Sequence, residues 1–220
     1  MPINTEKYTQ ILAERHDKAT LVAVSKTKPI EDIKALYDLG QRDFGENYVQ
    51  ELVDKYEQLP KDIRWHFIGH LQSNKIKYIA PFVHLIQGVD SLNLLKEINK
   101  QALKNNRLIN CLLQVHIAQE ETKFGFDSNE LRQLPELDHF PNANICGLMG
   151  MASFTNNEDL IRKEFKHLFQ LFSSLKQSNT VFANCQLPIA SFGMSSDYKI
   201  AIQEGSNMVR IGSLLFGERN

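Results

Sequence analysis

Short apolar runs alternate with amphipathic stripes along most of the chain. The first run, residues 21–24, contains two valines and is typical of a buried strand. A helical stripe follows over residues 33–39, and Gly40 closes it, as glycine commonly does at a helix end. The short apolar runs predict eight strands, at residues 21–24, 43–47, 64–68, 82–87, 111–117, 145–149, 186–190 and 208–211.

The alternation of strands and helices predicts a parallel sheet, because a parallel neighbour is reached through a right-handed crossover helix. Eight such strands suggest a closed TIM-type (β/α)8 barrel, and an open doubly wound sheet is the alternative. One detail favours the barrel. Only residues 212–220 follow the eighth strand, and an extra helix predicted at residues 4–17 would cover that gap. Since no linker interrupts the pattern, we expect one domain spanning residues 1–220.

Composition and charge exclude several classes of protein. With 42% hydrophobic residues, 23% charged residues and a net charge of −1, the chain is typical of globular proteins and lacks the basic surface of nucleic-acid binders. It has neither an apolar stretch of membrane-spanning length nor a signal-peptide pattern. Cys111, Cys146 and Cys185 are too scattered for a disulfide framework or a metal site, so we expect buried thiols. We expect a cytoplasmic monomer with no nucleic-acid or membrane partner.

Lys26 stands where the first strand has stopped and the next helix has not begun. In a parallel α/β protein, ligands bind at this edge of the sheet. Partial burial of a lysine lowers the pKa of its amine and so favours the neutral form that makes a Schiff base. The alternative is a solvated lysine at a strand end, which is what we expect of Lys28. This stretch alone leaves both interpretations open.

Unusual polar residues and glycines gather at the carboxyl ends of the predicted strands. In a barrel those ends converge on one mouth, so we expect these positions to face a common site. They are Lys26, Asn47, Gly69, His70, Asp90, residues 123–125, Met149, Gly150, residues 191–195 and residues 210–213. We assign no catalytic residue among them, and the chain shows no metal-ligand spacing, nucleophile elbow or Walker loop.

Two glycine–serine turns follow the last two predicted strands. The first contains Ser195, and the second contains Gly212 and Ser213. Barrel phosphate sites usually form from these two loops, because glycine lets an anion approach the backbone and serine hydroxyls donate to it. The alternative is that Ser195 caps a helix and Gly212 makes a tight turn. The residues alone do not decide between the two.

Arg210 is the only charged residue in the predicted eighth strand. A fixed positive charge there requires a polar barrel mouth or a carboxylate partner, so a structural ion pair is an equal alternative to a ligand contact. With a pyridine cofactor, the guanidinium would donate to the ring nitrogen. Its permanent charge would disfavour protonation of that nitrogen and weaken the ring as an electron sink.

Five segments together resemble the pyridoxal phosphate homeostasis proteins and, more distantly, the N-terminal barrel of alanine racemase. They are residues 23–29 (AVSKTKP), 44–51 (FGENYVQE), 65–75 (WHFIGHLQSNK), 192–197 (FGMSSD) and 209–213 (VRIGS). Since they run in order along essentially the whole chain, the combination is specific. Phe192 stands where this family often has methionine and Ser213 where threonine is frequent, and both keep the character of the site. Residues 123–125 agree with a Lys-x-Gly pattern of the family.

The resemblance implies a binding site for pyridoxal 5′-phosphate (PLP). It implies that Lys26 carries the cofactor as a Schiff base, that Asn47 lies near its ring and that Arg210 lies at its pyridine nitrogen. It assigns the phosphate to Ser195, Gly212 and Ser213, with Ser191 as a further candidate. No metal is implied.

Three functions remain open. The first is a PLP-binding protein that helps to regulate the intracellular supply of the cofactor, with little or no catalysis. The second is a PLP-dependent racemase-type enzyme acting on amino acids. In the racemases that this barrel resembles, an additional β-domain supplies the second acid/base, and we expect no such domain because the given chain ends just past the eighth strand. The third is a Schiff-base aldolase without a cofactor, which predicts a colourless protein.

Overall fold

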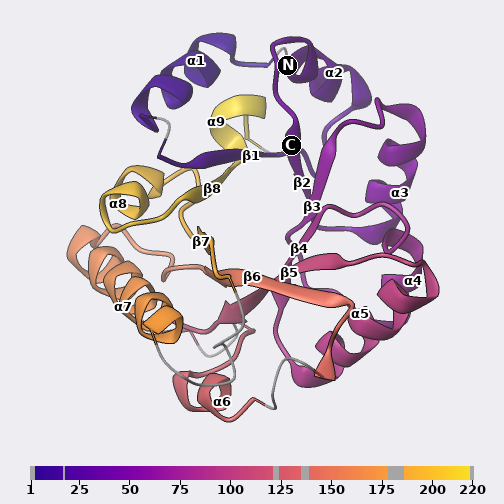
Figure 1. The fold of residues 1–220 in the computed structure, drawn as a ribbon. Helices are drawn as coiled ribbons and strands as arrows, with labels where there is room; N and C mark the ends of the chain where they lie inside the picture. The colour runs from indigo at the N-terminus through magenta and orange to yellow at the C-terminus, as the bar shows by residue number, and fades with distance from the viewer. Residues whose placement is uncertain (1–2, 17, 121–123, 135–138, 178–185, 219–220) are drawn as a thin grey trace.

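The computed structural model describes residues 3–16, 18–120, 124–134, 139–177 and 186–218. Within these ranges eight parallel strands close into a barrel, with β1 paired to both β2 and β8 (Figure 1). The predicted (β/α)8 barrel is confirmed, and the open doubly wound sheet is wrong. The strands are β1 (Thr20–Val24), β2 (Asp43–Glu46), β3 (Arg64–Phe67), β4 (Leu85–Val89), β5 (Ile109–Val115), β6 (Ala143–Gly150), β7 (Ile189–Ser191) and β8 (Met208–Ile211).

Helices surround the barrel on its outer side (Figure 1). The extra helix predicted at the N-terminus is α1, and the backbone N–H of Asn4 before it donates to the carbonyl of Leu215 at 2.8 Å. This bond ties α1 to the short helix that follows β8, as expected for the gap there. The helices are α1 (Thr5–Glu14), α2 (Ile30–Asp38), α3 (Val49–Gln58), the 3-10 helix η1 (Ser73–Lys75), α4 (Ile76–Ile79), α5 (Leu92–Lys104), α6 (Ser128–Arg132), α7 (Glu158–Gln177), α8 (Tyr198–Gln203) and α9 (Ser213–Phe216).

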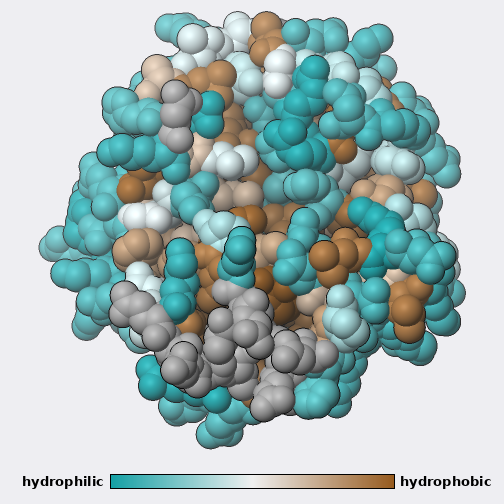
Figure 2. All heavy atoms as spheres, in the orientation of Figure 1, coloured by the Kyte–Doolittle hydropathy of each residue, from teal (hydrophilic) through white to brown (hydrophobic). Residues whose placement is uncertain are grey.

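The strands are buried on both faces, which explains their continuous apolar runs. Phe44, Trp65 and Phe67 belong to the larger hydrophobic cluster, which the helices cover. Val22 and Met208 belong to a second, smaller cluster. The face of the molecule drawn in Figure 2 has hydrophobic residues at its centre within a mostly hydrophilic surround. Packing on both sides therefore fixes the strands, and their carboxyl ends are held in place.

Three predicted strands are displaced. The fifth, predicted at residues 111–117, is Ile109–Val115, because Ile109 already pairs with Ala143 of β6. The fourth, predicted at residues 82–87, begins only at Leu85, because the N–H of Val83 still bonds to the carbonyl of Ile79 in a closing helical turn. The seventh, predicted at residues 186–190, is Ile189–Ser191, because Pro188 has no N–H to donate to a neighbouring strand. The short helices α6 and α9 were not predicted.

The expectation of buried thiols is met by the cysteines that the structure describes. Cys111 and Cys146 are buried free thiols, whereas Cys185 and Lys123 lie outside the described residues. In the described ranges no helix is long and apolar enough to cross a bilayer. The same part of the chain contains no cluster of side chains suited to a metal ion.

Candidate functional site

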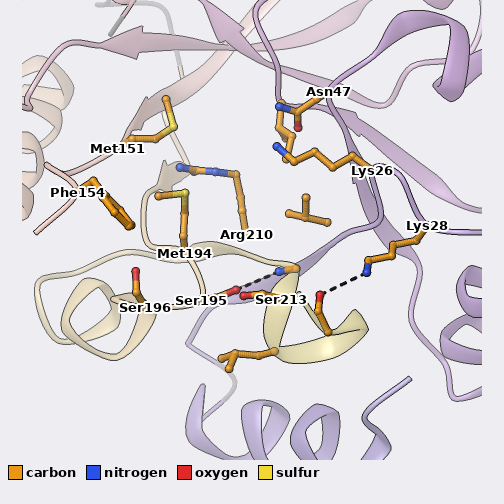
Figure 3. A pocket seen from close by; sticks show the side chains of 15 residues that line it. Lys26, Lys28, Asn47, Met151, Phe154, Met194, Ser195, Ser196, Arg210 and Ser213 are labelled. Atoms are coloured by element: carbon orange, nitrogen blue, oxygen red, sulfur yellow. Dashed lines mark hydrogen bonds between the residues drawn. The ribbon is translucent and has the colours of Figure 1, made fainter. Parts of the chain in front are cut away.

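A cavity of about 560 Å³ lies at the carboxyl ends of β1, β2 and β8 (Figure 3). Its volume is within the range of roughly 300–1,000 Å³ that is usual for small-molecule sites. Six of the seven predicted cofactor residues line it, namely Lys26, Asn47, Ser195, Arg210, Gly212 and Ser213. The seventh, Ser191, does not line it. The convergence predicted from the strand ends is therefore largely present.

Lys26 lies in the turn after β1, and its side chain extends into the cavity toward Asn47 (Figure 3). The next residue, Thr27, has a φ of +63°. A β-branched residue in this left-handed region costs on the order of 1–3 kcal/mol, so the surroundings must hold it there. The Thr27 N–H donates to Oε1 of Glu51 at 2.5 Å and thereby fixes the turn on one side of Lys26.

A buried charged cluster fixes the other side of Lys26. The hydroxyl of Ser25 donates to Oε1 of Glu46 at 2.6 Å, and Nζ of Lys55 donates to that same oxygen at 2.8 Å. Lys55 also donates to the Ser25 carbonyl at 2.7 Å and to Oε1 of Glu51 at 2.6 Å. We call Ser25, Glu46, Glu51 and Lys55 the Lys26 support cluster. Burial raises the pKa of Glu46 to about 7, although Lys55 and Ser25 oppose the shift.

Lys28 differs from Lys26 in its surroundings. Its Nζ donates to the carbonyls of Phe216, Gly217 and Glu218 at 2.9, 3.3 and 3.2 Å. The expectation of a solvated Lys28 is met only in part, because the half-buried side chain also closes the end of α9. Its three N–H donors are all occupied, which makes it a poor candidate for covalent chemistry.

Arg210 points into the cavity from β8 (Figure 3). One terminal nitrogen donates to the Ser191 carbonyl at 2.9 Å and to the Ser191 hydroxyl at 2.7 Å, and the other donates to the Gly150 carbonyl at 3.0 Å. These partners are uncharged, and among the residues that the structure describes no carboxylate is hydrogen-bonded to the guanidinium. Burial lowers its pKa to about 10, against an attraction to Asp197. Within the described residues, two of its five N–H groups remain available to a ligand.

Ser191 is fully buried and lies behind Arg210. Its hydroxyl accepts a hydrogen bond from Arg210 and donates one to Oε1 of Gln87 at 2.7 Å. Since its one proton is donated to Gln87 and the side chain is fully buried, Ser191 supports the guanidinium and does not face the cavity.

The two glycine–serine turns meet at the cavity. Oγ of Ser195 accepts the backbone N–H of Gly212 at 3.2 Å, and Ser195 and Ser213 lie side by side in Figure 3. Gly193 begins the first turn with a φ of +99°, and a Cβ there would lie 2.5 Å from the Cβ of Ala201. Ser195 therefore does not simply cap α8. It joins the two loops and keeps its own proton to donate.

Asn47 follows β2 and contributes a buried polar atom to the cavity wall. Its Oδ1 has no hydrogen-bond partner within the described structure. A buried polar atom of this kind calls for a ligand or water partner. Together with the available N–H groups of Arg210 and the two serine hydroxyls, it suits a ligand that carries both a polar ring and an anionic group.

Several predicted mouth residues do not line this cavity, among them Gly69, His70, Asp90, Gly125, Met149 and Gly150. Nδ1 of His70 lies 2.9 Å from Oδ2 of Asp90, and the His70 ring stacks on Phe124 with centroids 4.2 Å apart. Neither His70 nor Asp90 is among the residues that line the cavity. Only part of the predicted strand-end set therefore lines the cavity, and His70 and Asp90 form a separate pair.

Comparison with known proteins assigns the chain to a family. A model of the alanine racemase N-terminal domain matches residues 4–220. The pyridoxal phosphate homeostasis protein of Aquifex aeolicus is 43% identical over 203 residues, covering 91% of this chain and 87% of that protein. The protein of the same name from Haemophilus influenzae is 40% identical over 204 residues, covering 91% and 85%. This chain belongs to the pyridoxal phosphate homeostasis protein family.

Solved structures agree with the assignment to the homeostasis protein family. A structure of PipY from Synechococcus elongatus without PLP matches with a TM-score of 0.91 at 33% identity, covering 96% of this chain and 99% of PipY. Another structure of PipY has PLP bound and matches with a TM-score of 0.88. Alanine racemase from Bartonella henselae matches at 0.69 with 18% identity, covering 94% of this chain and 56% of the enzyme. That last similarity shows the fold alone.

Sequence reasoning missed two parts of the site in this homeostasis-family chain. The first is the pair Met151 and Phe154, which form an apolar wall with Met194 of the predicted stretch 191–195; Phe154 is 94% exposed. The second is the Lys26 support cluster. The spacing of Glu51 and Lys55, four residues apart on one helix, was a signal for the second, but their contact with the turn after β1 depends on how α3 packs.

Proposed function

We propose that this chain binds PLP in the cavity at the barrel mouth, holds it as a Schiff base on Lys26, and acts in intracellular PLP homeostasis. The observation that carries the proposal is the convergence of Lys26, Arg210 and the joined Ser195–Gly212 turns on one cavity. The names of the relatives and the PLP-bound structure of PipY support it.

Each group of the cofactor has a matching residue in this cavity. The amine of Lys26 provides the nucleophile, and its neighbours on both sides are fixed by the Lys26 support cluster. Arg210 has N–H groups for the ring nitrogen, and Asn47 has an unpartnered amide oxygen for the polar edge of the ring. The hydroxyls of Ser195 and Ser213 would donate to the phosphate, and Gly212, whose N–H already bonds to Ser195, would let the phosphate approach the backbone closely. When bound, PLP supplies an aldehyde and an electron-withdrawing ring.

The same residues argue for binding with little or no turnover. Electron withdrawal by the ring is greatest when its nitrogen is protonated, which a carboxylate partner favours. Arg210 keeps a pKa of about 10 despite its burial, so it stays positively charged at neutral pH and disfavours that proton. We therefore propose a non-enzymatic role. The proposal includes a cytoplasmic location, a single domain and a monomeric state.

The test is a titration with PLP followed by absorption spectroscopy. Wild-type protein should become yellow and bind one PLP per chain, and Lys26→Ala should lose the Schiff-base absorption band. Lys28→Ala is the matched control, because Lys28 lines the same cavity but its amine is occupied by carbonyls. If Lys28→Ala lost the band and Lys26→Ala kept it, the assignment would be wrong. A colourless wild-type protein with aldolase activity would favour the cofactor-free alternative.

A further inference from the structure

A continuous chain of hydrogen bonds crosses the barrel interior and ends at Arg210. Arg210 donates to the Ser191 hydroxyl at 2.7 Å, and Ser191 donates to Oε1 of Gln87 at 2.7 Å. Nε2 of Gln87 lies 3.0 Å from Nδ1 of His66, and Nε2 of His66 lies 3.0 Å from Oδ1 of Asp43. All five residues are buried. They come from β2, β3, β4, β7 and β8, so the chain connects opposite sides of the barrel.

The chemistry of the groups sets the direction of every bond in this chain. An amide nitrogen can only donate, so Nδ1 of His66 must accept from Gln87. The proton of a neutral His66 then lies on Nε2 and points at the Asp43 carboxylate. If the Gln87 amide were reversed, its oxygen would face Nδ1 of His66, and a neutral His66 would carry its proton there. The lone pair on Nε2 would then face the Asp43 carboxylate, which is repulsive. The stable arrangement therefore has each residue donating to the next, from the cation Arg210 to the anion Asp43.

Asp43 is a suitable end for such a chain. Nε and one terminal nitrogen of Arg64 donate to its two oxygens at 2.8 and 2.5 Å. Burial alone would raise the pKa of Asp43, but the bonds from Arg64 and His66 hold it well below its usual value. The carboxylate is therefore a fixed negative charge, and hydrogen bonds that all run in one direction strengthen one another.

We infer that Asp43, His66, Gln87 and Ser191 are positioning residues for Arg210. The chain holds the guanidinium against Ser191 and Gly150, and leaves its remaining N–H groups for the ligand in the cavity. It thereby lets residues deep in the barrel set how firmly the ring of the ligand is held. The identity of the ligand in this inference rests on the proposed function. The direction of the hydrogen bonds in the chain from Arg210 to Asp43 does not depend on it.

The polarity can be tested without any ligand by ¹⁵N NMR of His66. In the wild-type protein His66 should be neutral with its proton on Nε2. Gln87→Glu places an acceptor opposite Nδ1, so both ring nitrogens should become protonated. A wild-type His66 with its proton on Nδ1 would overturn the inferred direction. An unchanged His66 spectrum in both Gln87→Glu and Gln87→Leu would overturn the contact itself, because leucine can neither donate to Nδ1 nor accept from it.

The link to the ligand can be tested by PLP affinity in matched variants. Gln87→Leu interrupts the chain and should weaken PLP binding by about tenfold or more, with a shift of the absorption maximum of the bound cofactor. Gln114→Leu is the control. Gln114 is also a buried strand glutamine, but it donates to the Phe124 carbonyl and is not part of the hydrogen-bond chain. Its affinity should change by less than about twofold. Equal losses in the two variants would mean that the effect is general destabilisation.

A double-mutant cycle provides a second readout if Gln87→Leu folds poorly. His66 and Ser191 are linked through Gln87. Once Ser191→Ala has broken the chain, His66→Phe should weaken PLP binding no further, so the two effects should be non-additive. If the losses of PLP affinity in the two single variants multiplied in the double variant, as independent effects do, the inference would be contradicted. If the wild-type protein bound no PLP, the proposed function would fail, and the tautomer of His66 would still decide whether the chain is polarised.

Discussion

Oγ of Ser195 accepts the backbone N–H of Gly212 at 3.2 Å, which joins the loop after β7 to the loop after β8. The two loops are separated in sequence by α8 and β8. Their contact places the hydroxyls of Ser195 and Ser213 together at one end of the cavity (Figure 3). An anionic group at this end would meet two hydroxyl donors at once.

Replacing these two serines should affect phosphate recognition selectively. Ser195→Ala and Ser213→Ala should each weaken PLP binding by roughly 1.5–3 kcal/mol, the usual value for a hydrogen bond to a charged group. Binding of unphosphorylated pyridoxal should hardly change, and both affinities can be measured by spectroscopic titration. Ser174→Ala is the control, because the Ser174 hydroxyl bonds to the Leu171 carbonyl in α7. Equal losses for PLP and pyridoxal would show that the serines only shape the fold.

The buried Glu46 should make stability depend on pH. Its pKa is raised to about 7 in the folded protein from 4.5 in the unfolded chain, so the fold favours its protonated form. This contribution is fully present below pH 4.5 and is lost as the pH rises toward 7. It should amount to roughly 3 kcal/mol. Urea denaturation at pH 5 and pH 8 should show this loss in wild type relative to Glu46→Gln. Identical pH profiles for the two proteins would refute a raised Glu46 pKa.

Replacing Thr27 with glycine should not destabilise the protein. Its φ of +63° is strained for a β-branched residue but not for glycine, so Thr27→Gly should leave stability unchanged or raise it by about 1 kcal/mol. The bond from its N–H to Glu51 does not involve the side chain and should persist. Thermal unfolding measures the change. Gly205→Ala should instead lower the stability, because φ at Gly205 is +100° and a Cβ would lie 2.5 Å from the Phe169 ring. A clear loss of stability in Thr27→Gly would mean that its side chain has another role.

The PLP-loaded protein should show little or no turnover with amino acids. Arg210 stays charged at neutral pH and disfavours protonation of the ring nitrogen, so stabilisation of a carbanion should be weak. Racemisation, transamination and decarboxylation can be assayed with the common amino acids beside a known PLP-dependent racemase. Sustained multiple turnover that disappears in Lys26→Ala would instead favour the racemase-type alternative.

The barrel could be predicted from the sequence because its strands are buried on both faces and read as apolar runs. The convergence of Lys26, Asn47 and Arg210 on one cavity could be predicted because all parallel strands end at the same mouth. Ser191 shows the limit of this reasoning. The position at the end of β7 was correct, but strand ends alone do not tell whether a side chain faces the cavity or supports a neighbour behind it.

The supporting interactions could not be predicted, because they join residues far apart in the sequence. Glu46 and Lys55 meet Ser25 only when α3 packs beside β1 and β2. The contact between Gln87 and Ser191 spans 104 positions and crosses the barrel interior. Neither arises from a local pattern. Both depend on side-chain directions that closure of the barrel determines.

The most direct test of the account is borohydride reduction of the PLP-loaded protein followed by peptide mass mapping. Reduction should fix one phosphopyridoxyl group, and it should be found on the peptide containing Lys26. Lys28 is the informative neighbour, because it lines the same cavity with its amine bound to carbonyls. Label on Lys28, on Lys75 or on no lysine at all would contradict the account.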